Sequence, residues 1–373
     1  MIPFNQPCLV GNELAYIADA VKRGKISGNG YYTQACQQFL ENEFGYLKTL
    51  LTNSCTDALE MAALLIDIKA GDEVIMPSFT HVSTANAFLL RGAKIVFADV
   101  EANTPNLDVT KIASLVNKNT KAIVVVHYGG IAVNMQEVLH LAIEHNLFVI
   151  EDAAAALGGF YSKVPLGSIG HLAAISFHET KNIQCGEGGL LIINDERLIA
   201  RAEILWEKGT NRVAFNRGEI PSYDWMDLGS SFLPSELNAA YLYAQLEKFG
   251  HIQTLRRQQW ETYFESLAPL VESGRINIIT TPEYAIANYH LFGLLCANEL
   301  ERDKLASGLL ESGILAVSHY RALHLSPFFK NHYSGPELPN AVSFQHRILR
   351  LPLFHDLKDE DIAIICDRVK SLF

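Results

Sequence analysis

The sequence predicts an α/β protein with a mostly parallel central sheet and a smaller C-terminal α+β domain. Between residues 49 and 151, short apolar segments alternate with segments of helical periodicity, the pattern of a parallel sheet covered on both faces. The chain has 373 residues, 49% of them hydrophobic, which is too much for one small core. We therefore expect a large domain with an N-terminal arm over residues 1–250. We expect a connector helix and a small domain over residues 251–373.

The arm and the alternating region make up the first part of the chain. Helical spacing of apolar residues predicts two helices in the arm, at residues 13–21 and 31–44. The alternating region predicts strands at residues 50–51, 73–76, 94–98, 122–127 and 147–151. It predicts helices between them at residues 56–68, 82–90, 108–116 and 135–145. Ligands of such sheets bind beyond the carboxyl ends of the strands, so we expect the functional site there.

The second part of the chain begins with two more buried strands, at residues 172–177 and 190–193. Helices are predicted at residues 196–206, 235–249 and 252–267, the second capped by Ser235 and the third serving as the connector. The small domain is expected to contain strands at residues 276–279, 289–295 and 315–317 and helices at residues 301–312, 342–349 and 359–372.

Composition excludes several classes of function. The formal net charge is −11 and no block of lysine and arginine stands out, which argues against a nucleic-acid partner. The N-terminus has no charged and apolar signal-peptide regions, and no apolar stretch is long enough for a bilayer, so we expect no membrane association and a cytoplasmic location. The six cysteines are scattered without a Cys-x-x-Cys pair, which favours reduced thiols over disulfides or a zinc site.

Lys181 is the first candidate for chemistry. It lies in the turn between the two strands at residues 172–177 and 190–193, just before the cluster Gly186-Glu187-Gly188-Gly189. Glycines allow the backbone to turn back and approach a ligand closely. A lysine held in such a pocket loses solvation, so its pKa falls and it can act as a Schiff-base nucleophile. Taken alone, a solvated turn lysine explains Lys181 better.

Polar residues at other strand ends strengthen the case. Residues 78–81, 127–130 and 151–152 follow three predicted strands and are expected to line one pocket with Lys181. Asp152 directly after a buried strand, with Lys181 about thirty residues later, fits pyridoxal phosphate (PLP). This cofactor needs a lysine, a carboxylate for its pyridinium nitrogen, a flat group against its ring and donors for its phosphate.

The sequence offers a candidate for each remaining requirement. Ser54-Cys55-Thr56-Asp57 opens a helix and is expected to cradle the phosphate, together with Ser176 at a strand end. His81 or Phe79 is expected to stack on the ring. Each residue also has an ordinary structural explanation as a helix cap, a packing side chain or a solvated hydroxyl. The prediction therefore depends on their occurring together and in this order.

Metal, hydrolase and nucleotide-loop sites are less well supported. The pair His319 and His324 lacks an accompanying cluster of carboxylates or histidines, so we expect no metal. There is no Gly-x-Ser-x-Gly motif, and the glycines at residues 186–189 lack the Lys-Ser/Thr pair of a phosphate-binding loop.

Segments from Ile2-Pro3-Phe4 to residues 350–354 carry a resemblance that runs nearly end to end. The most discriminating motif is Phe177-His178-Glu179-Thr180-Lys181-Asn182, and others lie at residues 71–78, 83–88, 90–97, 207–212 and 229–231. In these segments the chain resembles the sugar aminotransferases of the DegT/DnrJ/EryC1/StrS family, and within the family it is most similar to transaminases that act on dTDP-4-keto-6-deoxyglucose. The resemblance implies the PLP-dependent transferase fold of type I, which is aspartate-aminotransferase-like.

The resemblance implies specific roles in a PLP-binding large domain. Lys181 would form the Schiff base and Asp152 would pair with the pyridinium nitrogen. The phosphate would be held by Thr56, Asp57 and Ser176, with Ser54 and Cys55 beside them. Ser231 stands where the family has an asparagine that reaches the neighbouring subunit's phosphate, which implies a homodimer with shared active sites. Two positions depart from the family pattern: Ala155 replaces a glutamine or histidine that contacts the ring oxygen, and His81 replaces an aromatic stacking group.

The resemblance also implies a two-stage reaction. L-glutamate would leave as 2-oxoglutarate and convert the cofactor to pyridoxamine phosphate (PMP). PMP would then aminate the C4 ketone of a dTDP-4-keto-6-deoxyhexose, for synthesis of a cell-surface polysaccharide such as O-antigen or common antigen. Amination of a nucleotide-linked 3-ketosugar and a non-catalytic sensor that keeps the fold are alternatives. A related 3-dehydratase has histidine in place of Lys181. The residues expected to contact substrate are Tyr31, Glu179, Lys208, Arg212, Tyr320 and His324.

Overall fold

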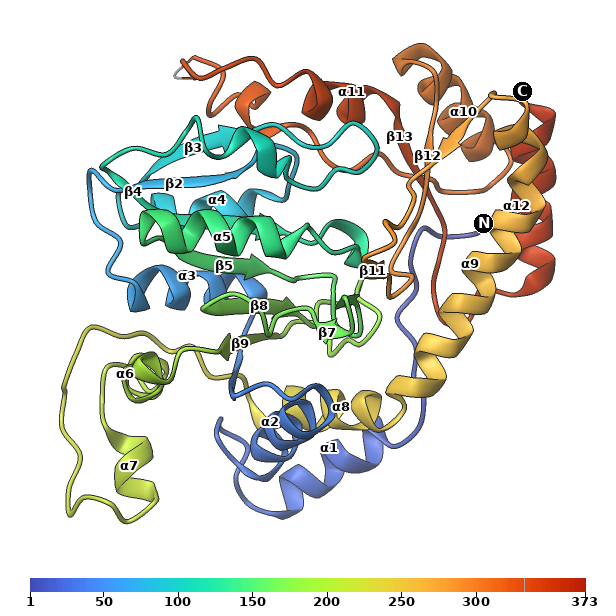
Figure 1. Cartoon of the computed structure of the whole chain (residues 1–373). Coiled ribbons are helices and arrows are strands. Elements are labelled where there is room, and N and C mark those ends of the chain that lie inside the picture. The colour runs from blue at the N-terminus through green and yellow to red at the C-terminus, as the bar shows by residue number, and fades with distance from the viewer. Residues whose placement is uncertain (332) are drawn as a thin grey trace.

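The computed structural model describes residues 1–331 and 333–373, and its centre is a seven-stranded sheet. The strand order is β1-β9-β8-β5-β4-β2-β3 (Figure 1). The strands are β1 (Lys48–Thr52), β2 (Glu73–Pro77), β3 (Lys94–Ala98), β4 (Thr120–Val126), β5 (Phe148–Asp152), β8 (Leu172–Ser176) and β9 (Gly189–Ile193). The pairs β2–β3, β2–β4, β4–β5 and β5–β8 are parallel, whereas β9 runs antiparallel to both β8 and β1. The expected mostly parallel sheet is confirmed.

Both faces of this sheet are buried. Along β8, Leu172 and Ala174 belong to one core cluster, whereas Ala173 and Ile175 belong to another. This alternation follows from the two-residue period of a strand, and it explains why the strands are apolar throughout. The first cluster is covered by α3 (Cys55–Leu65), α4 (Val82–Leu89) and α6 (Glu196–Trp206). The opposite face is covered by α5 (Met135–His145), α2 (Tyr31–Phe44) and α8 (Glu236–Glu247).

The N-terminal arm and a long excursion flank the sheet at one end (Figure 1). Helix α1 (Glu13–Lys22) packs against α8, whose N-cap is Ser235 as expected, with its hydroxyl accepting a hydrogen bond from the Asn238 N–H. Between α6 and α8 the chain makes an excursion that contains the short helix α7 (Arg212–Asn216).

Helix α9 (Phe249–Glu272) leads away from the large sheet to a smaller one (Figure 1). The smaller sheet has the order β10-β12-β13, with β10 at Asn277–Ile278, β12 at Phe292–Leu295 and β13 at Ile348–Leu351. It shares a separate core with α9, α10 (Glu299–Glu311) and α12 (Asp359–Ser371). We propose that the domain boundary lies at about residue 250, because this third core draws little on residues before α9.

Several contacts tie the C-terminal part back to the first 250 residues. The N-terminus of helix α11 (Pro339–Arg347) lies beside Asp99. The Asp99 carboxylate accepts hydrogen bonds from the N–H groups of Asn340 and Ala341 at 3.1 and 2.9 Å. Strand β11 (Ala285–Ile286) pairs with β6 (Phe160–Tyr161), which also pairs with β7 (Val164–Pro165). Single helical turns occur at Val109–Lys111, Tyr128–Gly130 and Leu323–Leu325.

Some expected elements are wrong. Residues 108–116 form one short turn, in which Asp108 accepts the Thr110 N–H, and no helix continues beyond it. The helix expected at residues 342–349 ends at Arg347, because Ile348 starts β13 and pairs with Leu295. Residues 315–317 form no strand, since among them only Val317 makes an isolated bridge, to Arg350, and β12 is shorter than expected. The last three errors concern short segments of the C-terminal part whose strand partners are distant in sequence. In the described part of the chain, no helix combines the length and apolarity needed to cross a bilayer.

Candidate active site

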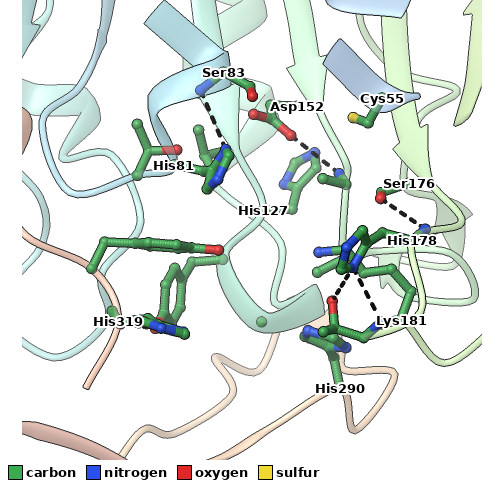
Figure 2. A pocket seen from close by; sticks show the side chains of 18 of the residues that line it. Cys55, His81, Ser83, His127, Asp152, Ser176, His178, Lys181, His290 and His319 are labelled. Carbon is green, nitrogen blue, oxygen red and sulfur yellow. Dashed lines mark hydrogen bonds between the residues drawn. The ribbon is translucent and has the colours of Figure 1, made fainter. Parts of the chain in front are cut away.

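A cavity of about 620 Å³ lies at the carboxyl ends of the parallel strands. Its wall includes residues at or beyond the ends of four strands: His81 in the segment after β2, His127 after β4, Asp152 on β5 and Ser176 on β8 (Figure 2). Nine of the residues expected from sequence line it together: Ser54, Cys55, Thr56, His81, Asp152, Ala155, Ser176, Lys181 and Tyr320. Segments far apart in the chain thus meet where an open α/β sheet binds ligands.

Lys181 enters this cavity from the turn between β8 and β9. The turn is closed by backbone hydrogen bonds from Phe177 N–H to Gly188 and from Glu179 N–H to Gly186, at 2.8 and 2.9 Å. Burial lowers the pKa of the Lys181 amine, and the positive charge of Arg350 lowers it further against the opposing effects of Cys55 and Asp152. The site therefore favours the neutral, nucleophilic form of the amine.

Asp152 is 5% exposed, and hydrogen bonds hold both of its carboxylate oxygens. Oδ2 accepts from the Thr84 hydroxyl at 2.6 Å, and Oδ1 accepts from the Ala154 N–H at 3.2 Å. Because a carboxylate only accepts, Thr84 must use its proton here, and its oxygen then accepts from Thr80 at 2.9 Å. The carboxylate is thereby fixed in orientation at the edge of the cavity.

The N-terminus of α3 provides a site for an anion. Its first residues, Cys55 and Thr56, line the cavity after the N-cap Ser54, and N–H groups at a helix N-terminus attract phosphate. Gly189 of β9 lies against this corner, since a Cβ there would come within 2.2 Å of the Ser54 carbonyl carbon. Thr56 donates a hydrogen bond to the Ser83 hydroxyl at 2.8 Å, which links α3 to α4. Asp57 is outside the lining, and its N–H already donates to Ser54.

The structure distinguishes the two candidates for ring stacking. Phe79 is fully buried and packs on Tyr128 and Phe344, whereas His81 lines the cavity. Nδ1 of His81 accepts the Ser83 N–H at 3.3 Å, which leaves the proton on Nε2. Burial lowers the pKa of His81, although the Asp152 carboxylate opposes this shift. His81 therefore presents a neutral ring to the cavity.

Arg350 is a lining residue that the sequence interpretation missed. It lies on β13 and is only 7% exposed, with its guanidinium 5.1 Å from the centre of the Phe4 ring. Its Nε has no hydrogen-bond partner among the described residues, and Nη1 lies 3.5 Å from Nδ1 of His319. The available signal was a lone basic residue within the apolar strand Ile348–Leu351. Nothing local indicated that this strand reaches the site.

Other residues expected at the site lie outside the cavity lining in the single chain. The exposed ones are Ser231, Tyr31, Glu179, Lys208 and Arg212. His324 is buried instead, with Nδ1 2.6 Å from the Ser78 hydroxyl. The backbone of Ser231 accepts a hydrogen bond from Asn53, which is next to the α3 cap.

No metal site accompanies this arrangement. Within residues 1–331 and 333–373, no three side chains of histidine, cysteine, aspartate or glutamate gather as ligands for an ion. The cavity offers instead an amine, a fixed carboxylate and a helix N-terminus.

Comparisons with known proteins agree with this geometry. The model of the DegT/DnrJ/EryC1/StrS aminotransferase family matches residues 7–370. The uncharacterized protein MJ1066 of Methanocaldococcus jannaschii is 30% identical over 383 aligned positions, which cover 100% of this chain and 97% of that protein.

Solved structures with the same fold carry the cofactor chemistry. Spr1654 of Streptococcus pneumoniae, solved in PMP and PLP forms, matches in its PMP form with a TM-score of 0.92 and 25% identity, covering 100% of this chain and 99% of that one. DesV of S. venezuelae, solved in complex with a ketimine intermediate, matches with a TM-score of 0.89 and 28% identity, covering 99% and 98%. The architecture is thus that of fold-type I PLP enzymes. The chain belongs to the DegT/DnrJ/EryC1/StrS family of PLP-dependent sugar aminotransferases.

Proposed function

We propose that this aminotransferase moves the amino group of L-glutamate to the C4 keto group of a dTDP-4-keto-6-deoxyhexose. The observation that carries the proposal is the meeting of Lys181, Asp152 and the N-terminus of α3 in one cavity. The choice of C4 and of the dTDP nucleotide rests on the motif around Lys181 and on the other similar segments. On the same basis, we propose that the enzyme acts in the cytoplasm and that its product is used for the synthesis of a cell-surface polysaccharide.

The residues present fit PLP. Lys181 supplies the amine, Asp152 a fixed carboxylate for the ring nitrogen, and Thr56 and Ser176 hydroxyls for the phosphate. The contact of Gly189 with Ser54 keeps the α3 N-terminus free of any side chain from β9, which leaves room for a phosphate. When bound, the cofactor supplies an electron-withdrawing ring that carries the amino group between the two substrates.

Lys181 is proposed to move the proton in both half-reactions. Its lowered pKa favours the neutral form of Nζ, which can take the proton from the α-carbon of glutamate. In the second half-reaction, the same atom returns a proton to the sugar carbon that receives nitrogen. Asp152 contributes the negative charge that balances a protonated ring nitrogen.

Arg350 is proposed to bind a carboxylate of the amino donor. A buried guanidinium without an ion-pair partner among the described residues is unfavourable until an anion reaches it. Arg350 lines the same cavity as Lys181, and its positive charge lowers the pKa of the Lys181 amine. Glutamate can therefore be anchored at one end while its α-carbon faces Lys181.

A second copy of the chain is proposed to complete the site. The excursion between α6 and α8 exposes Trp225 (79%) and Met226 (56%), and apolar groups clustered on a surface favour burial against a partner. Ser231, Lys208 and Arg212 lie on this excursion, and Tyr31 begins α2. In a homodimer these residues would reach the neighbouring cavity and contact the cofactor phosphate or the nucleotide.

The test is incubation of the holoenzyme with L-glutamate and dTDP-4-keto-6-deoxyglucose, followed by NMR of the nucleotide-linked product. We expect a sugar with an amino group at C4 and an equivalent amount of 2-oxoglutarate. If the enzyme aminated a 3-keto isomer and did not aminate the 4-ketosugar, the assignment to C4 would be wrong and C3 would take its place. A protein that binds PLP and transforms neither sugar would support a sensor.

A further inference from the structure

His290 is a buried histidine on the cavity wall with no role in the reaction described above. It follows β11, is 7% exposed and lines the cavity that contains Lys181 (Figure 2). Its Nδ1 lies 2.9 Å from Oδ1 of Asn182, the residue next to Lys181. Its own N–H donates to Asn288, so the backbone and the ring are both held in place.

The neighbours of Asn182 fix the proton on the ring. Nδ2 of Asn182 is 2.8 Å from the backbone carbonyl of Asn288, which can only accept, so this atom must be the amide nitrogen. Its second hydrogen goes to Oε1 of Gln253 at 3.0 Å. The atom of Asn182 that faces His290 is therefore the carbonyl oxygen, which cannot donate. Nδ1 of His290 must carry the hydrogen.

The other ring nitrogen is an acceptor without a partner. Burial lowers the pKa of His290 well below its usual range, and the charges of Lys181, Arg350 and Arg256 lower it further. The ring is therefore neutral, and Nε2 carries a lone pair. No donor among the described residues, Lys181 included, makes a hydrogen bond to Nε2, although Nε2 is not sealed in the interior. A nearly buried acceptor that faces the cavity is satisfied by a donor that enters the cavity, such as a hydroxyl group of a ligand.

We propose that Nε2 of His290 accepts a hydrogen bond from a hydroxyl group of the ketosugar and thereby selects the second substrate. The two substrates differ in the chemistry that the site must recognise. Apart from its α-amino group, which is the group that reacts, glutamate carries only carboxylates, which have no proton to donate and are attracted to Arg350. The ketosugar carries hydroxyl groups, which can donate to a neutral imidazole. A site that alternates between these substrates thus offers a cation to one and a lone pair to the other.

The proposal rests on the proposed function only in requiring a hydroxylated sugar ketone as acceptor, whatever its nucleotide. Its test uses His290→Asn in the holoenzyme. The amide nitrogen of asparagine is bonded to Cγ, like Nδ1 of histidine, so this variant keeps the donor to Asn182 and removes the acceptor. Conversion of the PLP form by glutamate and of the PMP form by the ketosugar are measured separately from the cofactor absorbance.

We expect His290→Asn to react with glutamate within about two-fold of the wild type, because no contact with glutamate is lost. With the ketosugar, kcat/KM should fall by about ten-fold or more, since a site built around a hydrogen bond loses it. His290→Gln places its amide near Nε2 and gives up the bond to Asn182. It should therefore keep more of the ketosugar reaction than His290→Asn while melting at a lower temperature.

Three results would overturn the proposal. Equal losses in both half-reactions would mean that His290 acts through Lys181. No loss in either half-reaction, or a loss only in the reaction with glutamate, would mean that His290 does not bind the ketosugar. Failure of the wild type with the 4-ketosugar would instead count against the proposed function, and His290 would be tested with the ketosugar that the wild type accepts.

A measurement on the wild type does not depend on whether the variants fold. In protein labelled with ¹⁵N-histidine, Nε2 of His290 should give the signal of an unprotonated nitrogen. That signal should shift when the amino-sugar nucleotide product is added and stay in place with 2-oxoglutarate. A protonated Nε2, or no shift with the product, would contradict the assignment.

Discussion

Thr84 donates a 2.6 Å hydrogen bond to Oδ2 of Asp152, and both residues are buried. Thr84 lies in the first turn of α4, the helix that His81 caps and that Ser83 links to Thr56. One helical turn therefore sets the positions of the Asp152 carboxylate, of the His81 ring proposed to stack on the cofactor, and of a hydroxyl at the proposed phosphate site.

Replacing Thr84 by valine should weaken PLP binding by about ten-fold or more. The change keeps the shape of the side chain but removes a hydrogen bond to a charged group, which contributes about 1.5–3 kcal/mol. Equilibrium titration of the apoprotein with PLP measures the effect. Thr84→Ser retains the hydroxyl and should bind PLP nearly as the wild type does. Equal affinities for the valine and serine variants would show that Thr84 does not position Asp152.

Lys181→Ala should lose transaminase activity by at least about 10²–10⁴-fold, because the residue proposed to move the proton is gone. Borohydride reduction of the wild-type holoenzyme should attach PLP to Lys181, as shown by mass spectrometry of its peptides. The variant should carry no label. The exposed Lys163 provides a control, and Lys163→Ala should be labelled normally. A reduced label on another lysine of Lys181→Ala would place the Schiff base elsewhere.

Arg350→Met should reduce kcat/KM for glutamate by about 30-fold or more, since removal of one partner of a buried charge pair costs about 2–5 kcal/mol. Steady-state kinetics at varied glutamate concentration provide the measurement. Arg350→Lys keeps the charge but loses the planar geometry that allows two parallel hydrogen bonds. Its kcat/KM for glutamate should therefore lie between those of the wild type and Arg350→Met. A normal response to glutamate with a lost response to the nucleotide sugar would assign the guanidinium to the phosphates.

The rate at which apoprotein takes up PLP should rise with pH through the pKa of Lys181, because only the neutral amine attacks the aldehyde. This pKa lies below the usual lysine value chiefly because of burial, with a further contribution from Arg350. Arg350→Met removes a cation that disfavours the ammonium form, so the pKa rises and the midpoint moves to higher pH. Arg257→Met, at an exposed position on α9, should leave it unchanged. If the midpoint moved to lower pH in Arg350→Met, the inferred effect of Arg350 on the pKa of Lys181 would be wrong.

Gly189→Ala should destabilise the protein by about 1–3 kcal/mol, the usual cost of overpacking, because its Cβ would meet the Ser54 backbone at 2.2 Å. Thermal unfolding of the apoprotein measures this effect. PLP affinity should fall as well, since Ser54 caps the helix at the phosphate corner. Gly250→Ala, in a helix with nothing within 4 Å of the new Cβ, should be neutral or stabilising by up to about 1 kcal/mol. Equal unfolding temperatures for the two variants would mean that β9 can shift away from Ser54 at little cost in free energy.

The sequence by itself determined the fold class and the half of the site that follows the strands of the large sheet. Apolar runs that end in polar residues, as at Asp152 and Ser176, place those residues at one edge whenever the strands are parallel. The glycines after Lys181 indicated a turn. These inferences succeed because the period of a strand and its carboxyl end are local properties of the chain.

Only the tertiary structure decided which residues complete the cavity. Arg350 and His290 come from the C-terminal part of the chain, and no local pattern separates them from an ordinary strand residue and an ordinary loop histidine. Tyr31, Lys208 and Arg212 looked suitable for a nucleotide but lie outside the lining of the single chain. The physical reason is that the charge, burial and missing partners that define a site residue arise from contacts between segments far apart in sequence.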